Sequence, residues 1–250
     1  SGEAEDLLQT ISDELRERRF APVVRLEVQA STPQNVRDLL CGELDLDMRD
    51  VYPVEGLLDL SHLDTFADLD FPALRFTPWE PVTPPALLPV ASPNADADIF
   101  SVIRSNDVLV QHPYESSAAS VELFIDRAAA DPRVLAIKEA LYRISYHSRV
   151  ARALIRAAEE GKQVAVLVEV TASLDEQRNI EWARKLESTG IHVVYGPAHL
   201  KVHAKVMLIV RREETGLRRY LYIGTGNLNA ATAAAYTDLG LFSVDKVLGE

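Results

Sequence analysis

Cysteine is almost absent from this 250-residue sequence, which has Cys41 alone. One thiol cannot form an intrachain disulfide, and a zinc site built on thiolates needs several cysteines close together. The sequence therefore excludes a disulfide-stapled domain and a cysteine-rich zinc module. Such sparse use of cysteine is typical of a reducing compartment, so we expect a cytoplasmic protein.

Positive charge is also scarce. The chain has 26 Lys and Arg against 38 Asp and Glu, which gives a formal net charge of −12. A general nucleic-acid binder needs a surplus of basic residues, and an anionic membrane surface also attracts basic segments. We therefore expect no nucleic-acid partner, and any anionic ligand must be held by a local basic pocket.

The sequence lacks long apolar runs and the common nucleotide-binding motifs. No run is long enough to span a bilayer, and the acidic start SGEAEDLLQT differs from a secretion signal. Gly161-Lys162-Gln163 lacks the glycine loop and the hydroxyl of a Walker A motif, and a kinase G-x-G-x-x-G is missing too. A phosphate-handling protein without these motifs needs another device, such as a histidine nucleophile.

Proline, in contrast, is concentrated in one stretch. The segment TPWEPVTPPALLPVASP, from Thr77 to Pro93, holds six of the 13 prolines. Proline fixes the backbone and removes a donor, so this stretch cannot be a regular helix or a central strand. We predict a linker or a surface strap over residues 78–98, joining domains at 1–77 and 99–250. A long loop inside one domain is the alternative.

The pattern before the linker predicts a mixed α+β unit. A helix is expected over residues 3–19, a strand over 23–30 and a proline-led helix over 33–41. We find no catalytic group of residues in this part.

After the linker, strands and helices alternate, which predicts an α/β sandwich with helices on both sheet faces. The β-branched run from Gln163 to Val170 suits a strand covered on both sides. The expected strands begin near Asp107, Arg133, Gln163, Ile191, His199, Arg218 and Leu239. Helices are expected to start at Ser116 or Ser117, Ser148 and Asp175, with a short one over 229–236, and Gly161 and Gly190 are expected to end two of them.

The segment Lys201-Val-His203-Ala-Lys205 is the first candidate for chemistry. In a strand, Lys201, His203 and Lys205 would share one face. Burying two unpaired ammonium groups is costly, so the pattern makes sense where an anion binds. The lysines would favour the neutral imidazole, which is nucleophilic. The alternative is an edge strand with a solvated basic row.

The second candidate is Gly224-Thr225-Gly226-Asn227, placed between an expected strand and an expected helix. Glycines let the backbone approach a ligand, and successive N–H groups next to a helix start can bind an anion. The alternative is an ordinary glycine turn in which Asn227 caps the helix.

The order H-x-K, then a glycine turn ending in Asn, is similar to half of a phospholipase D active site. The acid that completes H-x-K-x₄-D in those enzymes is missing, because Val210 stands at its position. A phosphodiesterase is therefore disfavoured.

Several motifs together resemble the type 1 polyphosphate kinases: HPYESS, VLAIKEALYR, DEQRNIEWA, LKVHAK, YIGTGNLN and AAAYTDLG. The resemblance begins near Val23 and implies the end of the middle (head) domain, followed by a truncated first C-terminal domain of phospholipase D-like fold. It also implies an ATP:polyphosphate phosphotransferase that uses Mg²⁺ and forms a phosphohistidine.

The resemblance assigns roles to single residues. His203 matches the phosphorylated histidine, Tyr236 the nucleotide-binding tyrosine of Y-T-D, and Arg143 the arginine of L-Y-R near magnesium. An arginine cannot ligate a cation, so Arg143 would hold phosphate oxygens that Mg²⁺ also contacts. Lys205 and the turn from Gly224 to Asn227 would bind phosphate.

The sequence departs from the family pattern at Ser173. The family places a second arginine there, in A-R-F-D-E, and the loss of a guanidinium aimed at the transferred phosphate could cost a few kcal/mol. Leu228 replaces the usual aromatic residue after the glycine turn. We expect ordinary structural roles for His112 in a loop, for His192 packed in a strand, and for the core-facing Trp182 and Leu186, while Glu169 could line a pocket.

The resemblance thus predicts reversible transfer of the terminal phosphate of ATP to polyphosphate through His203. The partners would be ATP or ADP, polyphosphate and the remaining domains of the same polypeptide, in an oligomer loosely associated with the membrane, and these 250 residues alone would be inactive. The alternatives are a phospholipase D-like phosphodiesterase and a non-catalytic polyphosphate-binding module.

Overall fold

The computed structural model describes residues 2–17, 20–92, 98–142, 148–169, 176–196 and 200–250. The chain folds into two compact units, one formed by residues 13–78 and the other by residues 1–12 with 79–250. Helix α1 (Gly2–Glu17) crosses the boundary between them. No helix in the described ranges has the length and hydropathy to cross a bilayer.

The smaller unit is built around a short parallel pair of strands. Strand β1 (Leu26–Gln29) pairs with β2 (Val51–Val54), and α2 (Gln34–Leu44) and η2 (Met48–Asp50) connect them. Val28, Cys41 and Val51 form its small buried core. The prediction of a helix, a strand and a second helix before the proline-rich stretch is confirmed.

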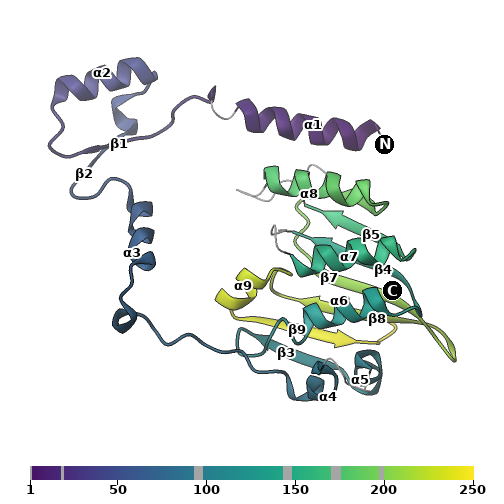
Figure 1. The fold of residues 1–250 in the computed structure, drawn as a ribbon. Helices are drawn as coiled ribbons and strands as arrows, with labels where there is room; N and C mark the ends of the chain where they lie inside the picture. The colour runs from purple at the N-terminus through teal and green to yellow at the C-terminus, as the bar shows by residue number, and fades with distance from the viewer. Residues whose placement is uncertain (1, 18–19, 93–97, 143–147, 170–175, 197–199) are drawn as a thin grey trace. The chain divides into compact units, whose positions relative to one another are not determined.

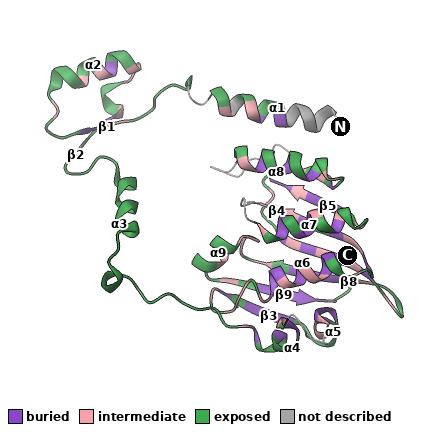
Figure 2. Ribbon diagram, viewed as in Figure 1, coloured by how far each residue is buried: buried purple, intermediate pink, exposed green. Residues whose placement is uncertain are grey.

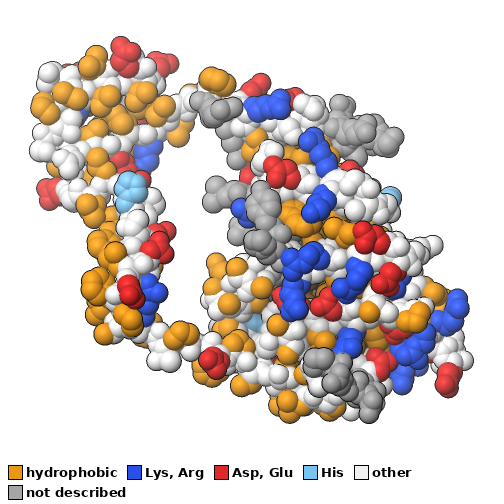
Figure 3. All heavy atoms as spheres, viewed as in Figure 1, with side chains coloured by type: hydrophobic (Ala, Val, Ile, Leu, Met, Phe, Trp, Pro, Cys, Tyr) orange, Lys and Arg blue, Asp and Glu red, His pale blue; other side chains and the backbone are white. Residues whose placement is uncertain are grey.

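The segment after β2 leaves its apolar side chains at the surface. It contains η3 (Leu60–Asp64), α3 (Thr65–Asp68) and η4 (Pro72–Leu74). Phe66, Leu74 and Phe76 are all largely exposed, and Figure 3 shows hydrophobic side chains along this part of the chain. This segment therefore adds nothing to the core of its unit.

The proline-rich stretch packs onto the larger unit over residues 79–92. Val82 accepts a hydrogen bond from the backbone of Ser116 and donates one to Tyr114, and the Trp79 ring meets the Tyr114 ring edge-on. The turns η5 (Pro85–Leu87) and α4 (Leu88–Ala91) bury Leu87 and Val90 almost completely. The described part of this stretch from residue 79 therefore lies against the larger unit.

The larger unit is centred on a seven-stranded mixed sheet of order β3-β9-β8-β7-β4-β5-β6 (Figure 1). Strands β4, β5 and β6 are parallel to one another, and the other neighbouring pairs are antiparallel. The strands are β3 (Val108–His112), β4 (Val134–Leu141), β5 (Gln163–Val168), β6 (His192–Tyr195), β7 (Lys205–Glu213), β8 (Gly216–Gly224) and β9 (Asp238–Ser243). All seven expected strands are present, which confirms the α/β class.

Helices cover one face of this sheet. They are α5 (Ile99–Ser105), α6 (Val121–Ala130), α7 (Arg149–Glu159) and α8 (Glu176–Ser188). A further short helix, α9 (Ala230–Ala235), follows the segment from Gly224 to Asn227. Figure 2 colours the buried residues, and many of them belong to these helices and to the strands of the sheet. The stripe of α6 and the residues Trp182 and Leu186 of α8 are buried, as expected.

The other sheet face differs from the prediction. In β5, Val164, Val166 and Val168 are buried towards the helices, whereas Ala165 and Leu167, which point the other way, are only partly buried. The same alternation occurs in β4 and β7. In the described part of the chain, helices therefore cover one face and not both.

Two predicted helix caps have different outcomes. The Ser148 hydroxyl accepts a hydrogen bond from the Ala151 N–H at 3.1 Å, so Ser148 is the N-cap of α7. Neither Ser116 nor Ser117 caps α6, because the helix begins one turn later with Ser120 at the N-cap position. Ser116 instead accepts a hydrogen bond from Ala119, which is a local turn that competes with helix initiation.

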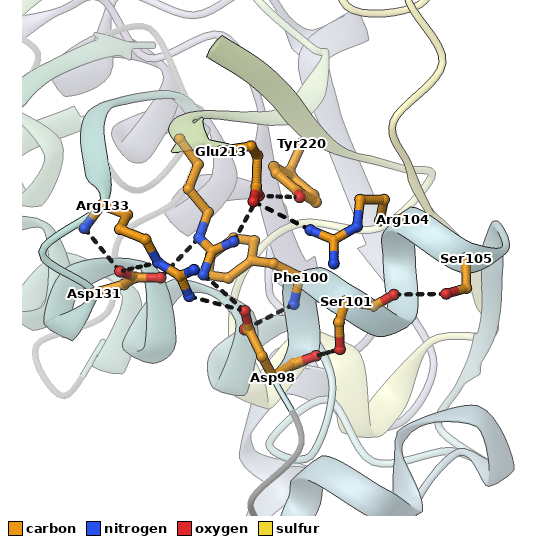
Figure 4. Close-up of polar contacts among 10 residues, drawn as sticks. Asp98, Phe100, Ser101, Arg104, Ser105, Asp131, Arg133, Glu213 and Tyr220 are labelled. Carbon is orange, nitrogen blue, oxygen red and sulfur yellow. Dashed lines mark hydrogen bonds and ion pairs between the residues drawn. The ribbon is translucent and has the colours of Figure 1, made fainter. Parts of the chain in front are cut away.

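A buried charged cluster ties the end of β7 to two other segments (Figure 4). The fully buried Arg211 guanidinium contacts Glu213, Asp98 and Asp131 at 2.6, 2.7 and 2.8 Å. Burial opposes its charge, but the hydrogen bonds to Glu213 and Asp131, together with the charges of Asp98 and Asp131, outweigh that effect and raise the pKa of Arg211. The three carboxylates make the buried charge tolerable.

We predict that Arg211→Met destabilises the chain by about 3–5 kcal/mol, since it leaves three carboxylates facing one another without their shared cation. Urea unfolding at neutral pH would measure this. The matched control is Arg212→Met at the exposed neighbouring position, which should change the free energy of unfolding by less than about 0.5 kcal/mol. Equal effects of the two substitutions would contradict a stabilising role of the buried Arg211 cluster.

Candidate functional site

The candidate residues gather at one edge of the large sheet, which we call the rim. Strands β3, β4, β5, β6 and β8 end at the rim, and β7 and β9 begin there. The backbone register places Lys205 opposite Gly224, and His112 opposite Asp238. Ligands of α/β proteins commonly bind at the carboxyl edge of the parallel strands.

The structure corrects the predicted strand around His203. Strand β7 begins at Lys205, and the residues from Lys201 to Ala204 lie before it without regular structure. The alternation rule therefore does not apply to Lys201 and His203. His203 and Lys201 are exposed, whereas Lys205 is buried.

The side chains of Lys201, His203 and Lys205 nevertheless share one neighbour, because all of them lie next to the ring of Tyr142. The His203 ring lies edge-on to it, with the centroids 4.9 Å apart. The Nζ atoms of Lys205 and Lys201 lie 5.0 and 5.6 Å from the Tyr142 centroid. Tyr142 follows the last residue of β4, so it stands at the rim. Sequence reasoning missed it, although its place directly after a buried strand was a usable signal.

Lys205 is held at the rim by the backbone of His203, two residues earlier. Its ammonium donates a hydrogen bond to the carbonyl oxygen of His203 at 2.6 Å. Burial lowers the pKa of Lys205, and the nearby Asp238 carboxylate partly offsets that effect. The carbonyl bond uses one of the three N–H donors of the ammonium group.

Glu169 and Gly196 hold the segment before β7 from the other side. The buried Glu169 carboxylate accepts a hydrogen bond from the Val202 N–H at 2.6 Å, so Glu169 supports the residue next to His203. A side chain at position 196 would place its Cβ 2.7 Å from Val202 Cγ2. Only glycine allows this close approach without displacing Val202.

The glycine turn is fastened to the start of β9. The Thr225 hydroxyl donates to Asp238 Oδ1 at 2.7 Å and accepts from the Leu239 N–H at 3.0 Å. A Cβ on Gly226 would overlap the Asp238 carboxylate. The turn is therefore tightly packed beside Lys205, as its register with β7 requires.

The short helix expected over residues 229–236 is present as α9. It runs from Ala230 to Ala235, and the Asn229 side chain caps it by accepting from the Ala231 N–H at 2.9 Å. Asn227 is therefore not the N-cap, and the helix start does not directly adjoin the glycine turn. Tyr236 follows α9 and is 65% exposed.

His112 and Asn227 face a small cavity of about 20 Å³, which is room for about one water molecule. His112 Nδ1 donates to the Glu115 carbonyl at 2.8 Å, which leaves its Nε2 as an acceptor. Among the described residues, neither this nitrogen nor Asn227 Oδ1 has a hydrogen-bond partner. His112 thus ends a strand, buried, where a loop residue was expected.

The remaining predicted residues are placed as follows. His192 lies in β6 but is exposed, so the expectation that it is packed was wrong. Arg143 and Ser173 lie outside the described residues. Within the described ranges, no group of three or more His, Cys, Asp or Glu side chains is arranged to hold a metal ion.

The sheet, with an exposed histidine, lysines and a glycine turn on one rim, defines an α/β domain of the kind that presents a reactive site at its strand ends. The family model "Polyphosphate kinase C-terminal domain 1" matches residues 98–250, and "Polyphosphate kinase middle domain" matches residues 1–66. The chain belongs to the polyphosphate kinase family.

Individual relatives agree with this assignment. The chain is 52% identical to the polyphosphate kinase of Synechocystis over 99% of its own length and 35% of the relative's. It is also 52% identical to that of Mycobacterium avium, over 98% of its length and 33% of the relative's. The crystal structure of polyphosphate kinase from Porphyromonas gingivalis matches 90% of this chain and 33% of that chain, with a TM-score of 0.72 at 28% identity. The chain thus spans about a third of the length of the curated relatives.

A buried acid behind the rim leads to a pH prediction. Both carboxyl oxygens of Glu139 are buried, without a hydrogen-bond partner among the described residues, and burial raises the pKa of Glu139 well above 4.5. Its carboxyl group is therefore protonated in the folded chain at pH values where the unfolded chain has released the proton. The contribution of Glu139 to the free energy of unfolding is fully present below pH 4.5, and it is lost as the pH rises through the pKa that Glu139 has in the folded chain.

We therefore expect Glu139→Gln to be more stable than the wild type at neutral pH, with a difference that disappears towards pH 4.5. The gap should widen with pH by up to about 1.4 kcal/mol per unit. Urea unfolding across this pH range measures it. A gap that is the same at every pH would show that Glu139 does not take up a proton on folding.

Proposed function

We propose that this chain carries the phosphoryl-transfer site of a polyphosphate kinase, with His203 as the nucleophile. The observation that carries the proposal is the exposed imidazole of His203 beside Lys205, on the rim where Lys205 pairs with Gly224. An exposed ring can reach a substrate phosphate, while its lysine neighbour and the turn are fixed by hydrogen bonds.

In the proposed reaction, a ring nitrogen of His203 attacks the terminal phosphorus of ATP in line. The new N–P bond forms as the bond from that phosphorus to the β–γ bridging oxygen breaks, and ADP leaves. A terminal oxygen of polyphosphate then attacks the same phosphorus, and the N–P bond breaks. Each step is reversible, because the imidazole first accepts the phosphoryl group and then returns it.

The protein would contribute mainly position and charge. In phosphoryl transfer, negative charge is spread over the equatorial oxygens, and preorganised donors stabilise it. Here Lys201 and Lys205 supply ammonium groups, and the turn from Gly224 to Asn227 would supply backbone N–H groups. This local positive charge would bind phosphate against a net charge of −12.

Other parts of the proposal extend to the nucleotide and the cation. Tyr236, exposed after α9, would contact the nucleotide, and Arg143 would hold phosphate oxygens. The described rim carboxylates of Asp238 and Glu169 already accept hydrogen bonds from Thr225 and Val202. Magnesium would therefore be held chiefly through substrate phosphates, which is common for this cation. Ser173 would offer only a hydroxyl where the family has an arginine.

We propose further that residues 1–77 end a middle domain and that residues 99–250 belong to the first C-terminal domain. The partners would be ATP or ADP, polyphosphate and the rest of a polypeptide about three times as long, as the coverage of the relatives supports. An oligomer, and a cytoplasmic site at the membrane periphery, belong to the same proposal.

The geometry disfavours a phospholipase D-type phosphodiesterase. Val210, which stands at the position of that family's acid, lies within β7 opposite Ala136 and Arg219. It brings no carboxylate to the rim. A non-catalytic polyphosphate-binding module is separated from the kinase by the following experiment.

We predict that the full polyphosphate kinase containing this chain, incubated with Mg²⁺ and γ-labelled ATP, gains an acid-labile, base-stable phosphate. His203→Ala should reduce the label by about 10³-fold or more, since it removes the nucleophile. His192→Ala is the matched control, because that exposed histidine lies in β6, and it should retain the label. A label that survives in His203→Ala would refute the assignment, and polyphosphate binding without any label would favour the non-catalytic module.

A further inference from the structure

Asn179 of α8 joins the ends of two neighbouring strands beneath the rim. Its side-chain amide donates one hydrogen bond to the carbonyl of Tyr142 at 2.8 Å and another to the carbonyl of Glu169 at 2.7 Å. These carbonyls directly follow β4 and β5, where the ladder between the strands ends. Asn179 is completely buried, and its bond to the Glu169 carbonyl is buried too.

The two bonded residues are those that support His203. The ring of Tyr142 contacts the His203 ring and the ammonium group of Lys205. The carboxylate of Glu169 accepts the N–H of Val202, one residue before His203. Asn179 therefore fixes the backbone of both supports at once.

The chemistry of the side chain matches this task closely. A primary amide has two N–H donors, and here they go to two carbonyl oxygens on adjacent strands. Aspartate has nearly the same shape but, when ionised, has only acceptors, which would face two other acceptors. Alanine would remove both donors from the two carbonyls at once.

We infer that Asn179 is a positioning residue for phosphoryl transfer at His203. It sets the distance between the ends of β4 and β5, and it thereby holds the Tyr142 ring and the Glu169 carboxylate where they keep the segment from Lys201 to Lys205 in place. The inference rests on the proposed function for its catalytic consequence, while the placement of the His203 ring can be tested separately. In an in-line transfer, a shift of about 1 Å at the nucleophile can reduce the rate by about 10²-fold.

The test compares Asn179→Asp, Asn179→Ala and Leu186→Ala. Leu186 is fully buried on the same helix, so Leu186→Ala disturbs the packing of α8 without removing a donor from the rim. In the full polyphosphate kinase, we expect both substitutions of Asn179 to lower kcat for His203 phosphorylation by about 10- to 100-fold, with KM for ATP changed by less than about 3-fold. Leu186→Ala should lower the melting temperature as much, yet retain kcat.

Nuclear magnetic resonance of the 250-residue chain gives the independent measurement. The ring current of the edge-on Tyr142 ring shifts the imidazole proton signals of His203. Both substitutions of Asn179 should therefore move these signals, and Leu186→Ala should not. Asn179→Asp should be at least as damaging as Asn179→Ala, although it preserves volume, because a purely space-filling role would predict the reverse order.

The outcomes separate the two proposals. If the wild-type enzyme shows no phosphohistidine but the signals of His203 still move in Asn179→Asp, the proposed function fails and the positioning role stands. If the wild type is labelled and Asn179→Asp keeps both the wild-type kcat and the His203 signals, the positioning role is refuted. Loss of kcat in Leu186→Ala equal to that in Asn179→Ala would also refute it, because stability alone would then explain the effect.

Discussion

The antiparallel pairing of β7 with β8 is the constraint on which the candidate site depends. It places Lys205, the first residue of β7, opposite Gly224, the last residue of β8. A slip of one residue would turn Lys205 to the other sheet face, because side chains alternate along a strand. The buried Met207 and Ile209 on the helix-covered face oppose such a slip, so the core sets the register of the rim.

The rim also depends on residues that are remote in sequence. Residues 201–204, directly before β7, have no regular backbone pairing. Their position depends on Tyr142, on Glu169 and on the Lys205 ammonium group. At the opposite end of β7, Arg211 and its three carboxylates hold the strand to the start of α5 and to the turn after α6. The strand is thus fixed at both ends by side chains rather than by helix packing alone.

Local pattern was enough to predict most of the fold. The β-branched runs identified the strands, and the hydroxyl of Ser148 identified the start of α7, because periodicity and capping depend on neighbours in sequence. The cap of α6 was misplaced because several serines stand within one turn of its start, and sequence alone does not choose among them. The uncovered sheet face was missed because a strand with Ala165 and Leu167 on one side reads as apolar on both.

The motifs of the candidate site could be predicted from the sequence, but the residues that hold those motifs in place could not. His203, Lys205 and the glycine turn follow from short patterns, whereas the contact of Tyr142 with His203 joins residues that are about sixty positions apart. The buried Arg211 cluster likewise depends on pairing across the sheet, which turns an apparently surface-type residue into a core one. Long-range contacts of this kind are set by topology, and a window of sequence does not contain them.

The close approach of Gly196 to Val202 has a consequence for how this domain can change over time. A methyl group at position 196 has no space unless position 202 becomes smaller, so the two sites are expected to vary jointly rather than independently. A substitution of Gly196, directly after β6, would therefore affect Val202, the residue before His203, through a steric clash and not through charge.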